Sequence, residues 1–177
     1  ALKQIRKCKG VGYIIKINKN RRLRSIFVLN DYTSQIRWTG NRGDGNATYD
    51  GYDRSWQLCS PGKPIIECSN DPLLGGDPQL HNPEDLLITA LSSCHMLWFL
   101  HLSLNAGIIV MCYEDNPIGH GESAPSGAGR FVAATLRPKI TIQPGMDPRA
   151  ADAVQCKRPH FCFVVKSVKF PVRMTAQ

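Results

Sequence analysis

Two cysteines stand where a thiol could do chemistry. Cys94 lies among small side chains in the string LSSCHM, and Cys162 lies 68 residues later in HFCF. A cysteine thiolate is a nucleophile, and the sulfenic acid that oxidation forms from it can condense with a second thiol to a disulfide. A single buried cysteine is more often a small hydrophobic residue, so the residue types alone leave a structural role open for each thiol.

The full set of cysteines and histidines narrows that chemistry. Seven cysteines without a CxxC pair or a secretory signal fit a reducing compartment with one or two functional thiols better than a disulfide framework. His95, His101 and His160 could be metal ligands beside the two cysteines. Because the sequence has no tetrahedral ligand set at the usual spacing, we expect packed or surface histidines and no metal.

A long helix is expected to carry Cys94. Asn82 is a favourable N-cap, Pro83 suits the first helical turn, and the apolar run that follows ends at Gly107. A helix of about 24 residues is long enough to cross a membrane, but its serines and histidines and its Pro/Gly-rich flanks favour a central helix enclosed by sheet. We therefore expect no membrane span.

The remaining pattern predicts a mixed α+β fold with an antiparallel sheet. The string NRGDG between two alternating segments is typical of a β-hairpin. In order, we expect a hairpin of residues 32–40 and 46–58, a connecting segment at 60–81, a strand at 108–113, a loop at 115–129, a strand at 131–143, a short helix at 148–156, and at 161–172 either a strand or the end of a helix followed by a strand.

Charge divides the chain into two parts. Nine of the 22 Lys and Arg residues, and none of the 14 Asp and Glu residues, lie in residues 1–30. This indicates a basic N-terminal arm of residues 1–30 followed by one near-neutral domain of residues 31–177. The arm is typical of an organelle-targeting segment, of a segment that binds RNA phosphates, or of a solvated tail. A mitochondrial or a cytoplasmic location is expected.

The strings around the two cysteines resemble a known family. HNPEDLLITALSSCHMLWFLHL and CFVVKSVKFPV are similar to the two cysteine signatures of the OsmC/Ohr family of thiol-dependent peroxidases, which reduce organic hydroperoxides. The string WTGNRGDGNATYDGYDRSW resembles the opening of one OsmC-like subgroup. These matches follow one another in order over most of residues 32–172.

The resemblance implies a fold and a set of roles. Family members are intertwined homodimers in which antiparallel sheets wrap two central helices, with the active sites at the interface. On that pattern Cys94 is the peroxidatic nucleophile, Cys162 is the resolving thiol, and Glu84 is a carboxylate that orients an activating arginine. The implied partners are an organic hydroperoxide and an external dithiol reductant, with no bound cofactor.

The activating arginine has two candidates. Arg54 in YDRSW matches the subgroup, whereas Arg42 in the Gly-rich turn resembles the arginine of the Ohr branch; we favour Arg54. Ten residues of straight helix separate Glu84 from Cys94 by about 15 Å, too far for both to share one guanidinium. A site that uses both would therefore draw on two chains.

Two functions follow from these features. The first is a thiol peroxidase that reduces organic or fatty-acid hydroperoxides in oxidative-stress defence, with the apolar face of residues 97–102 helping to line an acyl pocket. The alternative is a structural subunit with an OsmC fold in a larger assembly, such as a mitochondrial ribonucleoprotein, docked through residues 1–30. The two functions do not exclude each other.

Overall fold

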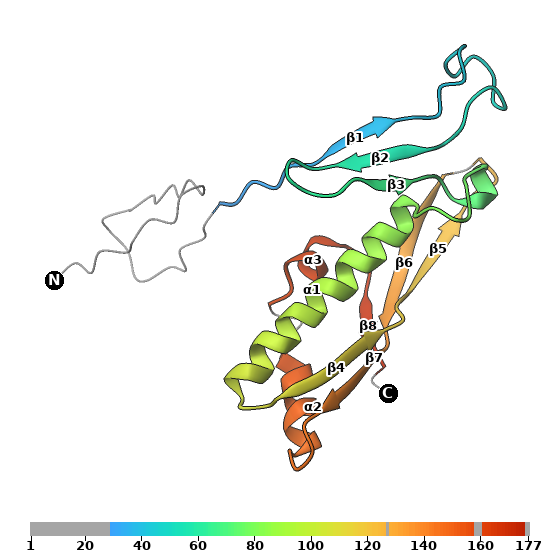
Figure 1. Cartoon of the computed structure of the whole chain (residues 1–177). Coiled ribbons are helices and arrows are strands. Elements are labelled where there is room, and N and C mark those ends of the chain that lie inside the picture. The colour runs from blue at the N-terminus through green and yellow to red at the C-terminus, as the bar shows by residue number, and fades with distance from the viewer. Residues whose placement is uncertain (1–28, 127, 158–160, 176–177) are drawn as a thin grey trace, which may run out of the picture.

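The computed structural model describes residues 29–126, 128–157 and 161–175 of the 177-residue chain. Residues 1–28 of the basic arm lie outside these ranges, as does His160, so the roles expected for them stay predictions. The described residues form an α+β domain in which one long helix lies on two small sheets, with a third sheet near the start of the helix (Figure 1). The expected α+β class with antiparallel sheets and a central helix is confirmed, and the expected dimer stays a prediction.

The long helix α1, Pro83–Asn105, begins and ends where the sequence predicts. The Asn82 side chain accepts a hydrogen bond of 2.7 Å from the backbone N–H of Asp85, and the Asp85 carboxylate accepts one of 3.4 Å from the N–H of Asn82. This capping box satisfies N–H groups that no helical carbonyl can reach. At the other end Gly107 adopts φ 72°, a left-handed conformation that glycine takes without strain.

The predicted hairpin forms the first sheet. Strand β1, Gln35–Trp38, pairs antiparallel with β2, Trp56–Cys59, as expected. The strands are shorter than predicted, and residues 39–55 form a long loop rather than a tight turn. β2 also pairs with β3, Ile66–Cys68, which lies inside the predicted connecting segment, and the 3-10 turn η1 follows at Pro72–Leu74.

Two further sheets come from the C-terminal half. β4, Val110–Asp115, pairs antiparallel with β7, Pro138–Ile142. β5, Ile118–Ser123, pairs antiparallel with β6, Gly129–Leu136, whose other edge pairs with β8, Val172–Met174. The β6–β8 pair is parallel, which the expectation of an antiparallel sheet did not include.

Two elements predicted for this half are wrong. Residues 115–129 are not a loop, because they contain the whole of β5 and reach the first residue of β6. The predicted strand at 131–143 is divided at Arg137 between two different sheets. There the N–H of Arg137 donates a hydrogen bond of 2.7 Å to the side-chain carboxylate of Asp115 and not to a backbone carbonyl, and Pro138 has no N–H to donate.

Two short helices complete the domain. α2, Pro148–Lys157, matches the predicted helix, and α3, Phe163–Ser167, followed by β8, matches the second alternative for residues 161–172. α1 packs against both helices and against β4 and β5. The buried residues of the core form two clusters, one of Phe99, Ile108, Ala151 and Val154, and one of Ile88, Leu91 and Ala134. Both clusters contain residues of α1, so this helix joins them.

The described part of the chain covers one side of α1. The buried positions recur every three or four residues, at Ile88, Leu91, His95, Phe99 and Ser103. On the opposite side Leu97, Leu100 and Leu104 are exposed. By length and composition alone α1 could cross a membrane, since an 18-residue window has a mean hydropathy of 1.4, and 22% of that window is buried. Its packing against two helices and two sheets is that of a core helix with one apolar face still uncovered.

Candidate active site

The two predicted cysteines lie in contact. The Sγ atom of Cys162 is 2.7 Å from the Sγ atom of Cys94 and donates a hydrogen bond to it. Cys94 is half-buried in the middle of α1, whereas Cys162 is 1% exposed. Both are free thiols. The fold thus joins two cysteines whose roles the residue types alone left open.

Cys162 is held by the start of α3. It is the residue immediately before the helix, and its carbonyl accepts a hydrogen bond of 3.1 Å from the N–H of Lys166. Val164 and Val165 in the first turn pack against the core cluster that contains Leu91. Because Leu91 belongs to α1, the docking of α3 places the backbone of Cys162 beside the central helix.

The two thiols have different environments. Burial, and next the hydrogen bond donated to Cys94, raises the pKa of the Cys162 thiol to about 11. Cys162 therefore stays protonated at neutral pH and acts as the hydrogen-bond donor of the pair. Cys94 is the acceptor, and as the more exposed thiol it is the one that a solute can reach first.

Aromatic side chains flank the thiol pair, and the sequence interpretation missed them. Trp98 lies four residues after Cys94, on the same face of α1. Its ring centroid is 5.2 Å from that of Phe161, the residue before Cys162, with the planes 31° apart. The His101 ring packs edge-on against the Trp98 ring, with the two centroids 5.6 Å apart. The sequence does show an aromatic residue close to each cysteine, but only the fold brings these two residues together.

Glu84 lies away from the thiol pair. It is exposed in the first turn of α1, and ten residues of unbroken helix place it about 15 Å along the axis from Cys94. Glu84 lines a hollow of about 410 Å³, together with His81, Asp85, Ile88, Thr89, Pro117, Gly119 and Phe131. At Gly119 β5 approaches α1 so closely that a Cβ atom there would lie 2.7 Å from the Ile88 side chain. The chain does not bring Glu84 to its own Cys94.

The guanidinium of Arg54 is held on the loop between β1 and β2. It donates hydrogen bonds of 2.9 Å to the Tyr52 carbonyl and 2.7 Å to the Tyr49 carbonyl. The guanidinium also lies 4.4 Å and 4.3 Å from the centroids of those two rings, within cation–π distance. The loop extends away from α1 (Figure 1). Arg54 is therefore held by Tyr49 and Tyr52 of its own loop, and these contacts do not involve Cys94.

Arg42 lies on the same loop. It donates a hydrogen bond to the Asp50 carbonyl and forms an ion pair of 3.8 Å with Asp53, and both side chains of that pair are exposed. An exposed ion pair of this kind contributes little to stability. The choice between Arg54 and Arg42 as the activating arginine stays a prediction.

The described histidines of α1 occupy the kinds of position that the sequence predicts. His95 is 4% exposed, and its Nδ1 atom lies 3.0 Å from the hydroxyl of Tyr113 on β4. His101 is exposed beside Trp98. The first is a packed histidine and the second a surface one.

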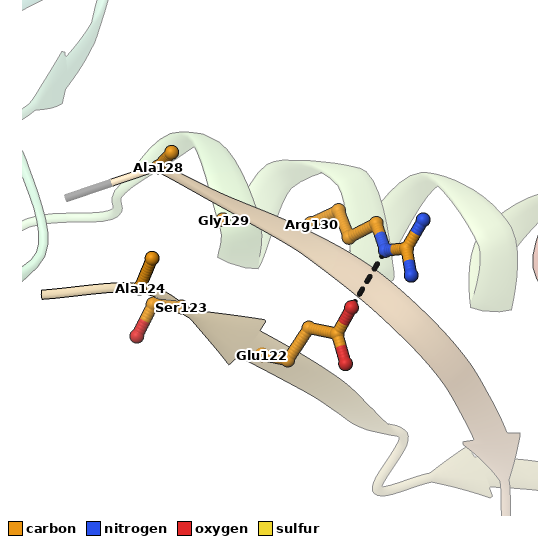
Figure 2. A pocket seen from close by; sticks show the side chains of 6 residues that line it. All are labelled: Glu122, Ser123, Ala124, Ala128, Gly129 and Arg130. Carbon is orange, nitrogen blue, oxygen red and sulfur yellow. Dashed lines mark hydrogen bonds and ion pairs between the residues drawn. The ribbon is translucent and has the colours of Figure 1, made fainter. Parts of the chain in front are cut away.

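A second hollow, of about 440 Å³, lies where the end of β5 connects to the start of β6. Figure 2 shows its lining residues and the ion pair across it, in which Arg130 Nε is 2.7 Å from Glu122 Oε1. Both side chains of this pair are largely exposed, and the lining contains no thiol. We therefore place the candidate active site at the Cys94–Cys162 pair.

The geometry can be compared with solved structures. An OsmC-like protein of unknown function from Vibrio cholerae O1 biovar eltor is 22% identical, with a TM-score of 0.75 over 84% of this chain and 100% of that chain. An organic hydroperoxide resistance protein OsmC from Legionella pneumophila is 17% identical, with a TM-score of 0.59 over 82% and 97%. The organic hydroperoxide resistance protein OhrB of Bacillus subtilis is 16% identical, with a TM-score of 0.55 over 82% and 98%. No protein-family model and no curated protein sequence matches the chain.

These likenesses define the class by its fold. Structural neighbours across most of the chain are OsmC-like and Ohr proteins. The chain has the OsmC-like fold, and the resemblance seen in its cysteine strings is confirmed at that level. At these identities the activity of a neighbour does not carry over by itself, so the function is argued next from the site.

Proposed function

We propose that this chain is a thiol peroxidase that reduces organic hydroperoxides, with Cys94 as the peroxidatic cysteine and Cys162 as the resolving cysteine. The observation that carries the proposal is the 2.7 Å contact between the two thiols at the centre of an OsmC-like fold. Two structural neighbours are organic hydroperoxide resistance proteins, which supports the choice of substrate class.

The chemistry uses the difference between the two thiols. The thiolate of Cys94 attacks the hydroperoxide, so that an S–O bond forms, the O–O bond breaks, and the alcohol leaves after taking a proton. The sulfur of Cys162 then attacks the Cys94 sulfenic acid, so that an S–S bond forms, the S–O bond breaks, and water leaves with the proton of Cys162. An external dithiol reduces the disulfide and restores both thiols.

A second copy of the chain completes this proposal. The first sheet carries apolar residues in register on one face, where Ile36, Leu58 and Ile66 lie opposite one another on β1, β2 and β3. Ile36 is 71% exposed, and the uncovered face of α1 carries Leu97 and Leu100. A sheet face and a helix face that both lack cover fit a dimer in which the sheet of one copy lies on the helix of the other.

The same dimer would supply the missing charges. Arg54 and Glu84 do not reach Cys94 within one chain, but a loop of the partner copy can bring a guanidinium to a thiol that faces outward from α1. A guanidinium beside the thiolate stabilises its negative charge and binds peroxide oxygens. We propose that Arg54 has this role, held in place by its contacts with Tyr49 and Tyr52.

Three cysteine variants test the function. Purified wild-type protein and the Cys94→Ser, Cys162→Ser and Cys112→Ser variants are mixed with cumene hydroperoxide and dihydrolipoamide, and consumption is followed by stopped flow. Cys94→Ser should abolish consumption, and Cys162→Ser should stop after about one equivalent, because the sulfenic acid lacks its partner. Cys112 is an exposed cysteine of β4 and serves as the matched control. Full turnover by Cys94→Ser overturns the assignment.

A second function is favoured by the charge of the arm. Nine basic residues without an acidic one suit a segment that lies along RNA phosphates, in a mitochondrial or a cytoplasmic assembly, and each neutralised phosphate makes binding more sensitive to salt. The test compares RNA binding of the full chain and of the chain lacking residues 1–30 at several salt concentrations. Equal binding by both chains rules out this role. If the full chain binds more tightly, the slope of log K against log[salt], about 0.7 for each contact on single strands, gives the number of contacts.

A further inference from the structure

The contact between Trp98 and Phe161 is adjacent to the contact between the two thiols, because each ring lies close in sequence to one of the cysteines. Trp98 follows Cys94 by one turn of α1, and Phe161 precedes Cys162 by one residue. The two rings are 5.2 Å apart between centroids, and the two sulfur atoms are 2.7 Å apart. The segment that carries Cys162 is therefore fastened to α1 at two adjacent points.

The other neighbour of Cys162 is fastened elsewhere. The Phe163 ring lies 5.7 Å from that of Tyr32, which precedes β1, and both side chains are exposed. Phe161 and Phe163 thus flank one buried cysteine, but it is the Phe161 ring that packs on a ring of the helix that carries Cys94, whereas the Phe163 ring packs on Tyr32. Two phenylalanines, one on each side of Cys162, therefore have different partners, so Phe163 can serve as a matched control for Phe161.

We infer that Trp98 and Phe161 are positioning residues that set the place of the Cys162 thiol against Cys94 and so govern how readily the two close to a disulfide. This inference rests on the proposed function for its biological meaning, because a resolving thiol must reach the sulfenic acid before a second oxidant does. A pair of packed aromatic rings stabilises a contact beyond the area that it buries, so this contact favours the docked position of a short segment.

Two reactions compete for the Cys94 sulfenic acid. In the first, the sulfur of Cys162 forms the S–S bond and water leaves. In the second, the sulfenate attacks another molecule of hydroperoxide, a second S–O bond forms, the O–O bond breaks, and an alcohol departs. The product on Cys94 is a sulfinic acid, which a dithiol does not reduce. If the Trp98–Phe161 contact is lost, Cys162 is held less closely to Cys94. The rate of the first reaction then falls, and the rate of the second does not change.

The decisive experiment needs no hydroperoxide. The full chain and its Phe161→Ala, Phe161→Leu, Phe161→Tyr and Phe163→Ala variants are equilibrated without oxygen in buffers of reduced and oxidised glutathione. The Cys94–Cys162 disulfide is then quantified by mass spectrometry of peptides after alkylation. Phe161→Ala should lower the effective concentration of the thiol pair about tenfold, which corresponds to about 30 mV for this two-electron couple. Phe161→Tyr, which keeps the ring, should restore the wild-type value.

The outcomes separate this inference from the proposed function. Phe161→Leu keeps apolar bulk without the ring and decides the question if Phe161→Ala fails to fold. An equilibrium unchanged by the loss of the ring, or an equal shift in Phe163→Ala, overturns the inference even if the protein consumes hydroperoxide normally. A tenfold shift confined to the Phe161 variants that lack the ring, in a protein that consumes no hydroperoxide, sustains the inference and removes the peroxidase function instead. With cumene hydroperoxide, Phe161→Ala should also accumulate more Cys94 sulfinic acid for each equivalent consumed.

Discussion

Ser92 donates a hydrogen bond of 2.6 Å to the carboxylate of Asp115, which joins the middle of α1 to the end of β4. The other oxygen of the same carboxylate accepts the 2.7 Å hydrogen bond from the N–H of Arg137, the residue immediately before β7. One side chain thus ties the central helix to both strands of a sheet. The tie is made two residues before Cys94, so it also fixes the height of that thiol above the sheet.

Loss of this carboxylate should destabilise the fold. Asp115→Ala leaves the Ser92 hydroxyl and the Arg137 N–H without their partner, which costs about 1–3 kcal/mol of the free energy of unfolding. Ser92→Ala removes one of the two hydrogen bonds and should cost less, about 1 kcal/mol. Urea unfolding of the three proteins measures both values. An Asp115→Ala protein as stable as the wild type would show that the carboxylate holds nothing in place.

Removal of Arg54 should slow the reaction of Cys94 with an alkylating reagent. The thiolate is the reactive form, and a nearby guanidinium favours it. Iodoacetamide labelling near pH 7, followed by peptide mass spectrometry, should give a rate several-fold lower for Arg54→Ala than for the wild type. Arg42→Ala is the matched control on the same loop. If Arg42→Ala slows labelling and Arg54→Ala does not, Arg42 is the activating arginine.

Alkaline pH should remove the stability that the protonated Cys162 provides. The pKa of this thiol is about 11 in the folded chain, against 9.0 for an ordinary cysteine, so the folded state holds the proton more tightly. The contribution is complete below pH 9 and is lost as the pH rises through about 11.

The Cys162→Ala variant isolates this contribution from the other groups that titrate in the same range. Under reducing conditions, the difference in free energy of unfolding between wild type and Cys162→Ala should be constant from pH 7 to about 8.5 and shrink towards pH 11. Urea titrations at five pH values measure it. A difference that grows with pH contradicts a raised pKa for Cys162.

A charge on the uncovered face of α1 should dissociate the proposed dimer. Leu97 is 61% exposed in the single chain, so Leu97→Asp leaves the monomer core intact but places a carboxylate at the expected interface. Sedimentation equilibrium should give a dimer for the wild type and a monomer for Leu97→Asp. Leu73→Asp is the control, because Leu73 is 92% exposed on η1, outside both α1 and the strands of the first sheet. A wild-type protein that is monomeric at high concentration excludes the dimer.

The sequence predicts elements well where their signals are local. Asn82, Pro83 and Asp85 begin α1 by capping and by their charge, and Gly107 ends it, all within one turn of the helix ends. The helix expected at residues 148–156 is also found, as α2. These signals need no knowledge of what lies across the fold.

Strands that depend on distant partners were missed or merged. β5 contains Gly119 and Gly121, which resemble a loop in isolation, yet its pairing with β6 makes it a strand, and Gly119 is needed because α1 passes so close. β6 and β7 read as one strand because the change of sheet at Arg137 is set by Asp115, 22 residues earlier. Sheet membership is a property of the tertiary structure.

The candidate site divides in the same way. The contact between Cys94 and Cys162 was expected from the resemblance of their strings and not from physical reasoning on either residue, because nothing local links positions so far apart. The Trp98–Phe161 contact was not expected at all. The roles proposed for Arg54 and Glu84 depend on a second copy of the chain, because neither side chain meets Cys94 within its own chain.

The separation of 68 positions between the two thiols also sets an order of events during synthesis. Translation at about 5–20 residues per second makes Cys94 about 3–14 s before Cys162. Throughout that time the nascent chain carries the Cys94 thiol on an apolar segment, without Cys162, its later partner. If an oxidant reacts with Cys94 on the ribosome, no second thiol of the site is present to condense with the sulfenic acid. Each new chain therefore depends on the cell's own reductants until Cys162 has emerged.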